Sequence, residues 1–144
     1  MENQITEANL IREMLAAFPE LQPLYQETIG GWTEADFPGR YTIIGQTFAA
    51  EIRRELTAGV MTEFLRRSAV FMERVSVSGD DEAINIIWIK IFEWLMYRPK
   101  ELQLFWPILG PATKAHIRDA AHRWTEAEKH FCSMDGLPEA NIPD

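Results

Sequence analysis

The chain has 144 residues, of which 47% are hydrophobic and 25% are charged, a balance typical of a folded domain and not of a disordered chain. Its 22 acidic and 14 basic side chains give a net charge of −8, which argues against binding to nucleic acid backbones. A single cysteine, Cys132, excludes an internal disulfide framework. The sequence shows no signal peptide, and its most apolar stretch, 84–96, is too short to span a membrane. We expect a soluble cytoplasmic protein with neither nucleic acid nor membrane as a partner.

Apolar residues recur every three or four positions along most of the chain, which is the period of amphipathic helices. Thr6 can cap a first helix that runs to Ala17, and Pro19 ends it. Further helices are predicted over residues 20–28, 42–58, 61–75, 81–97 and 111–131. A loop is predicted at 31–40 and a short turn at 100–106.

The predicted helix 81–97 differs from the others because apolar residues surround nearly its whole circumference, which is typical of a buried helix. Asp80 or Asp81 can cap its start. The tryptophans Trp88, Trp94 and Trp124 are assigned to the core.

The order of these elements predicts one compact all-α domain of about six helices over residues 1–133. Its helix pairs are expected to stack as α-hairpins, either as an irregular HEAT-like solenoid or as a bundle, around the buried helix at 81–97. Residues 134–144 are expected to form a loose C-terminal tail.

The last predicted helix carries a polar row at spacings of three and four residues: His116, Asp119, His122, Glu126 and His130. Histidines and carboxylates at such spacings can hold zinc or a similar metal. The row lies opposite the apolar positions of the same helix, so a solvated face is the favoured interpretation, and metal binding is the alternative.

No catalytic constellation emerges from the sequence, and we expect neither an enzyme nor a cofactor. Cys132 and His130 are two residues apart, which points them to different sides of a helix. Gly30-Gly31 lacks the pattern of a phosphate-binding loop. The arginine pairs 53–54 and 66–67 are interrupted by glutamates, which is typical of a solvated face with ion pairs.

The N-terminal quarter of the chain is the most acidic part, since residues 1–39 hold seven acidic side chains and one basic side chain, a net charge of −6. The predicted loop in this segment combines aromatic and acidic residues, and Glu20 and Glu27 precede it. This pattern fits a protein-binding hot spot, although the two loop rings could equally fold back onto the core. The candidate partner-binding residues are Trp32, Glu34, Asp36, Phe37, Glu27 and Glu20.

Several short motifs carry a resemblance to a known family. They are Phe18-Pro19-Glu20-Leu21, the segments 64–67 and 71–73, Asp80-Asp81-Glu82 and Gly110-Pro111-Ala112-Thr113. Over about residues 14–131 the chain resembles a bacterial family of small all-helical domains of unknown function. The resemblance implies a protein similar to those encoded near toxins, such as immunity proteins.

These observations together predict a non-enzymatic, acidic protein-binding module. The most specific hypothesis is an immunity-type inhibitor that masks a basic site on a toxin or effector. The alternatives are a metal-binding or metal-sensing protein that uses the row on the last helix, and a helical regulator or scaffold unrelated to toxins.

Overall fold

The computed structural model describes residues 4–30, 39–128 and 138–143, and within these ranges the protein is all-α, as predicted. The α-helices are α1 (Leu10–Ala17), α2 (Gln22–Ile29), α3 (Arg40–Gln46), α4 (Phe48–Ala58), α5 (Glu63–Ser78), α6 (Asp81–Ile87), α7 (Glu93–Met96), α8 (Pro99–Phe105) and α9 (Pro111–Glu128). A π-helical turn, Trp88–Phe92, joins α6 to α7, and short 3₁₀ turns lie at Pro19–Leu21, Trp106–Ile108 and Pro138–Asn141. None of the described helices is long and apolar enough to cross a membrane.

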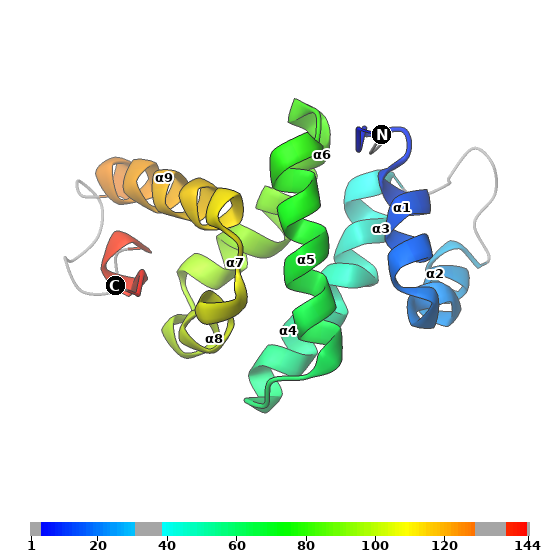
Figure 1. Ribbon diagram of the computed structural model, residues 1–144, viewed down its shortest axis with the longest axis horizontal. Coiled ribbons are helices and arrows are strands. Elements are labelled where there is room, and N and C mark those ends of the chain that lie inside the picture. Colours follow the sequence, from blue (N-terminus) through cyan, green and yellow to red (C-terminus); the bar gives the residue numbers. More distant parts are fainter. Residues whose placement is uncertain (1–3, 31–38, 129–137, 144) are drawn as a thin grey trace.

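Helix α5 stands in the middle of the molecule, with α1–α3 on one side and α7–α9 on the other (Figure 1). It packs against α1, α4, α6 and α9. The continuous rod from α6 to α7 also contributes to the core, because residues such as Ile86, Ile91 and Leu95 are fully buried. The two halves of the chain therefore share one hydrophobic core.

Four phenylalanine rings form the centre of the N-terminal half. Phe18 lies 5.0 Å from Phe48, 5.1 Å from Phe64 and 5.7 Å from Phe71, measured between ring centroids. Tilted and edge-on pairs at such distances add roughly 0.5–1.5 kcal/mol each beyond the apolar area that they bury. Because the rings come from the end of α1, from α4 and from α5, they hold these three helices together.

The predicted helix over 42–58 is two helices, α3 and α4, which meet at a break at Thr47. The backbone of Thr47 leaves the helical region, with φ −114° and ψ −87°. Its buried hydroxyl donates a hydrogen bond to the carbonyl of Ile43 at 2.7 Å. A threonine that bonds to the carbonyl four residues earlier bends helices, and the apolar spacing alone does not show this.

The prediction of a short turn over 100–106 is wrong, because residues 99–105 form α8. Pro99 ends the preceding helix and also occupies the first turn of the next one, where its missing N–H is not needed. Leu102 and Phe105, three residues apart, are both fully buried. The segment between Pro99 and Pro107 is therefore helical and not a turn.

Two of the motifs that carry the family resemblance contact each other across α1 and α5. The guanidinium of Arg67 donates a hydrogen bond to Glu20 at 3.1 Å and another to the carbonyl of Ala17 at 3.3 Å. It also lies 5.3 Å from the centroid of the Phe18 ring. The hydrogen bonds from Arg67 hold the pKa of the Glu20 carboxyl below its usual value. This pair joins the turn that follows α1 to the first part of α5.

Glu73 on α5 caps the start of α9. Its carboxylate accepts hydrogen bonds from the backbone N–H of Ala112 at 3.0 Å, and from the N–H and hydroxyl of Thr113 at 2.8 and 2.9 Å. Burial alone would raise the pKa of Glu73, but these donors outweigh it and lower the pKa below its usual value. A Cβ at Gly110 would lie 2.3 Å from the Glu73 carboxyl carbon, so this approach requires glycine there.

Asp80 is the residue that caps α6, and it also holds the N-terminal segment. Its carboxylate accepts hydrogen bonds from the N–H of Ala83 at 2.8 Å and of Glu7 at 3.2 Å. Its own N–H donates to the carbonyl of Ile5 at 2.9 Å. Asp81, the other predicted cap, lies in the first turn of α6.

Part of the expected loose tail is packed against the domain. Pro138 is buried, and the side chain of Asn141 donates a hydrogen bond to the carbonyl of Met96 at 2.7 Å. The N–H of Glu139 donates to the hydroxyl of Thr125 at 2.8 Å. Residues 138–143 therefore cover one end of α7 and α9, while the rest of the tail lies outside the described residues.

Candidate protein-binding surface

The π-helical turn places Trp88 at the edge of the core. Ile91 and Phe92 in this turn are buried, whereas Trp88 is half-buried. A π turn contains one more residue than an α turn, and such turns are frequent at functional sites. The predicted helix 81–97 is therefore a core helix that is not buried all round.

Trp124 on α9 packs beside Trp88. The centroids of the Trp88 and Trp124 rings are 6.2 Å apart, with a tilt of 31° between their planes. Two small residues on the inner side of α9, Ala120 and Ala121, are fully buried and allow the helix to approach α7 closely. The two tryptophans thus form one half-buried aromatic pair at the surface.

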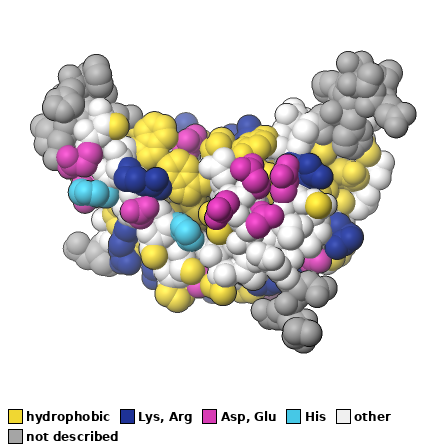
Figure 2. All heavy atoms as spheres, turned by 90° about the horizontal axis from the view of Figure 1, so that it is seen from above, with side chains coloured by type: hydrophobic (Ala, Val, Ile, Leu, Met, Phe, Trp, Pro, Cys, Tyr) yellow, Lys and Arg dark blue, Asp and Glu magenta, His cyan; other side chains and the backbone are white. Residues whose placement is uncertain are grey.

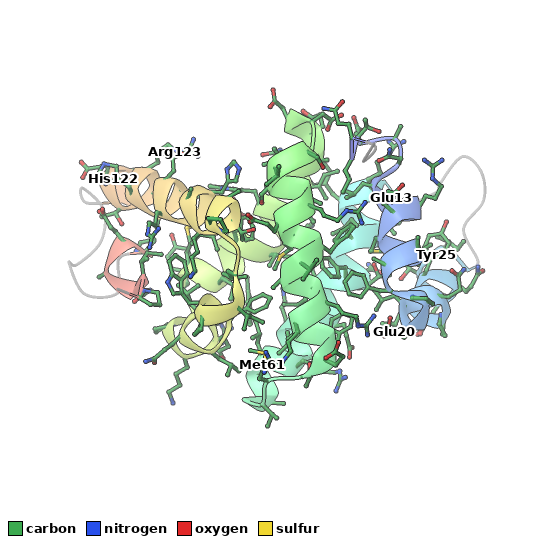
Figure 3. All side chains as sticks on the ribbon, viewed as in Figure 1. Glu13, Glu20, Tyr25, Met61, His122 and Arg123 are labelled. Atoms are coloured by element: carbon green, nitrogen blue, oxygen red, sulfur yellow. The ribbon has the colours of Figure 1, made fainter. Side chains whose placement is uncertain are left out.

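Arg123 lies against this pair. Its guanidinium is 5.7 Å from the centroid of the Trp88 ring, within the range of a cation–π contact. It also forms an ion pair with Asp119 at 3.2 Å, in which the two side chains are 65% and 69% exposed. Figure 3 shows Arg123 and His122 on the outer side of α9. An ion pair this exposed contributes little to stability, so its partners can be exchanged at low cost.

Two adjoining hollows surround the aromatic pair, and both are lined by Trp88 and Arg123. One has a volume of about 210 Å³ and reaches α6, and the other has a volume of about 320 Å³ and follows α9. We call the surface made by these residues the tryptophan face. It consists of Asp81, Ile84, Asn85, Trp88, His116, Arg123, Trp124 and Ala127.

Polar groups border the tryptophan face on the side of α6. The amide of Asn85 donates a hydrogen bond to the hydroxyl of Tyr41 at 2.8 Å, and Asp81 and His116 line the smaller hollow. Glu82 is exposed in the same first turn of α6. Figure 2, which looks onto the molecule from above, shows acidic side chains gathered beside a large hydrophobic patch. The face therefore combines half-buried aromatic rings with a charged rim.

The side chains of the polar row on the last helix make separate interactions with different partners. His116 lines the smaller hollow, Asp119 pairs with Arg123, and the Nδ1 of His122 lies 3.0 Å from the Glu139 carboxylate. Within residues 4–30, 39–128 and 138–143, no three histidine, cysteine or acidic side chains lie close enough to hold a metal ion. His130 lies outside the described residues.

The other predicted site residues fall in the N-terminal half. Trp32, Glu34, Asp36 and Phe37 lie outside the described residues. Glu20, labelled in Figure 3, lies just after α1 and is paired with Arg67 of α5. Glu27 is exposed and lines a hollow between α2 and α3. Binding by these residues stays a prediction.

The tryptophan face was missed by sequence reasoning because Trp88 and Trp124 occur at apolar helix positions and were assigned to the core. One signal was present. Trp124 is adjacent in sequence to Arg123, which belongs to the polar side of α9, so its large ring lies at the border between the apolar and polar sides.

The fold defines a small all-α domain that carries a half-buried pair of tryptophans beside two surface hollows. The chain belongs to the family described as Domain of unknown function (DUF7674), whose model matches residues 11–128. No curated protein and no solved structure matches the chain.

Proposed function

We propose that the protein is a non-enzymatic protein-binding module and that the tryptophan face is its contact surface. The observation that carries this proposal is the half-buried surface pair of Trp88 and Trp124, with the guanidinium of Arg123 over the Trp88 ring. Tryptophan and arginine are the residues most enriched among those that dominate binding energy at protein interfaces. The two hollows beside the pair offer space for side chains of a partner.

Charge supports a basic partner. The whole chain carries −8, and three acidic side chains, Asp81, Glu82 and Asp119, lie on or beside the tryptophan face together with Arg123. A negative surface speeds the encounter with a positive one and disfavours partners of like charge. In its most specific form the proposal is an immunity-type inhibitor that masks a basic site on a toxin.

The exposed ion pair between Arg123 and Asp119 supports exchange of partners on binding. A basic side chain from the partner can pair with Asp119, and Arg123 can then bond to an acceptor on the partner. Because solvent already screens the internal pair, its loss costs little.

Binding measurements on the proteins encoded beside this gene test the proposal. Each is purified and titrated against the wild-type chain at low and high salt. We expect one basic protein to bind, more weakly as salt is raised. Trp124→Ala should weaken binding about 30-fold, which corresponds to about 2 kcal/mol for a central interface residue.

Trp94→Ala is the matched control. Trp94 is also half-buried and also lies near arginines, with Arg53 at 5.8 Å and Arg98 at 5.3 Å from its ring centroid. Trp94 and these two arginines are not part of the tryptophan face, so Trp94→Ala should leave the affinity for the partner unchanged. Thermal unfolding of both variants shows whether they remain folded. The proposal fails if no neighbouring product binds, or if both tryptophan substitutions weaken binding equally.

A further inference from the structure

Trp94 on α7, outside the tryptophan face, has the guanidinium groups of two arginines over its ring. That of Arg53 on α4 lies 5.8 Å from the centroid of the Trp94 ring, and that of Arg98, just before α8, lies 5.3 Å from it. Helix α8 contacts both α4 and α7, and Figure 1 shows these three helices together below α9. The fold therefore brings two positive charges from separate elements to one aromatic ring.

Among the described residues, neither Arg53 nor Arg98 has an acidic partner. Lys90, four residues before Trp94, has none either, and Glu93 and Glu101 pair with none of these three cations. Five other arginines of the chain do pair with carboxylates: Arg40, Arg54, Arg67, Arg74 and Arg123. Positive charges that gather without a counter-charge repel one another and attract an anion.

Arg53 is oriented by the fold but uses few of its donors. Its Nη2 donates a hydrogen bond to the carbonyl of Lys90 in the π turn at 2.5 Å, the only hydrogen bond that Arg53 makes among the described residues. A guanidinium carries five N–H donors. In the part of the chain that the structure describes, the Arg53 Nε is the one buried side-chain nitrogen or oxygen without a hydrogen-bond partner. Such an orphan in a folded protein indicates a missing partner, such as a bound ion or water.

We propose that Arg53 and Arg98 form a binding site for the phosphate group of a small molecule. Guanidinium groups bind phosphate oxygens through pairs of parallel N–H···O hydrogen bonds. A phosphate monoester carries nearly two negative charges at neutral pH, which matches two guanidinium groups, whereas a carboxylate carries one. Because the half-buried Trp94 ring already holds both arginines, little of their freedom is lost on binding.

Nuclear magnetic resonance of the full chain tests the site with inorganic phosphate as the probe, at constant ionic strength. We expect saturable shifts of the indole N–H signal of Trp94 and of the Nε–H signals of Arg53 and Arg98. Acetate should require about tenfold higher concentrations, since it offers half the charge. Glycerol phosphate distinguishes the two sources of the group: tighter binding than inorganic phosphate indicates a phosphorylated metabolite, and equal binding indicates the phosphate ion itself. The site shares no residue with the tryptophan face, so this test does not depend on a protein partner.

Arg98→Gln should weaken phosphate binding about tenfold, and the fold should tolerate it because Arg98 is exposed. Arg118→Gln is the matched control. Arg118 is also exposed and lies 5.0 Å from the centroid of the Trp106 ring, with Lys114 at 5.4 Å from the same centroid. It removes the same charge from a similar pair of cations that has one guanidinium instead of two, and it should leave the affinity unchanged. The absence of a saturable shift, or equal weakening by both substitutions, overturns the proposal.

Discussion

At the residue scale, Glu73 shows how one carboxylate joins two helices. It belongs to α5 but accepts hydrogen bonds from two backbone N–H groups at the start of α9. These N–H groups have no partner within their own helix, and the positive end of the helix dipole favours a negative charge there. The sequence shows the glutamate and the start of α9 but not their contact, because 39 residues separate Glu73 from Ala112.

Glu73→Gln should destabilise the protein by about 1–2 kcal/mol at neutral pH, because it removes the charge that caps α9. Since the folded state lowers the pKa of Glu73, its contribution is present above the pKa of the unfolded chain. It is lost as the pH falls through the folded pKa. Urea unfolding at several pH values should therefore show a difference from wild type that shrinks below about pH 4.

Glu27→Gln serves as the control for this measurement, because Glu27 is exposed on α2. It should change the free energy of unfolding by less than about 0.5 kcal/mol. A Glu73→Gln variant that matches the wild type at neutral pH would show that the cap contributes nothing.

At the scale of the elements, apolar periodicity predicted most helices but not their interruptions. The break at Thr47 arises from a side-chain hydrogen bond, and the π turn at Trp88–Phe92 arises within a mostly apolar run that contains Lys90. Neither changes the spacing of apolar residues in the sequence enough to be seen. Pro99 predicts the end of a helix, but it also lies in the first turn of α8, which the sequence pattern does not indicate.

The start of α6 provides a prediction with a neighbouring control. Asp80→Ala removes the acceptor for the N–H groups of Ala83 and Glu7, so we expect a loss of about 1–2 kcal/mol in unfolding free energy. Hydrogen exchange should quicken at both of these amides. Asp81→Ala should have a smaller effect, limited to the loss of a favourable charge near the helix start. Equal effects of the two substitutions would contradict the assignment of Asp80 as the cap.

At the scale of the whole molecule, the motifs behind the family resemblance hold the fold together. Glu20 pairs with Arg67, Glu73 caps the segment that starts at Gly110, and Asp80 fixes the N-terminal segment. Trp88 and Trp124, on which the proposed function rests, lie outside these motifs. The all-α class could be predicted because helical periodicity is a local property.

The candidate surface could not be predicted in the same way. Whether a tryptophan at an apolar position is fully or half-buried depends on how α6, the π turn and α9 meet, and the sequence of each helix does not fix that. The predicted loop hot spot around Trp32 and Phe37 lies outside the described residues and stays a prediction.

The most direct test of the central claim is oxidative footprinting of the wild-type chain, alone and bound to the partner found by titration. The labelling of each tryptophan is read by mass spectrometry, without any substitution. We expect protection of Trp88 and Trp124 in the complex, and unchanged labelling of Trp94. Equal labelling of Trp88 and Trp124 in the free and bound protein would contradict the assignment of the tryptophan face as the binding surface.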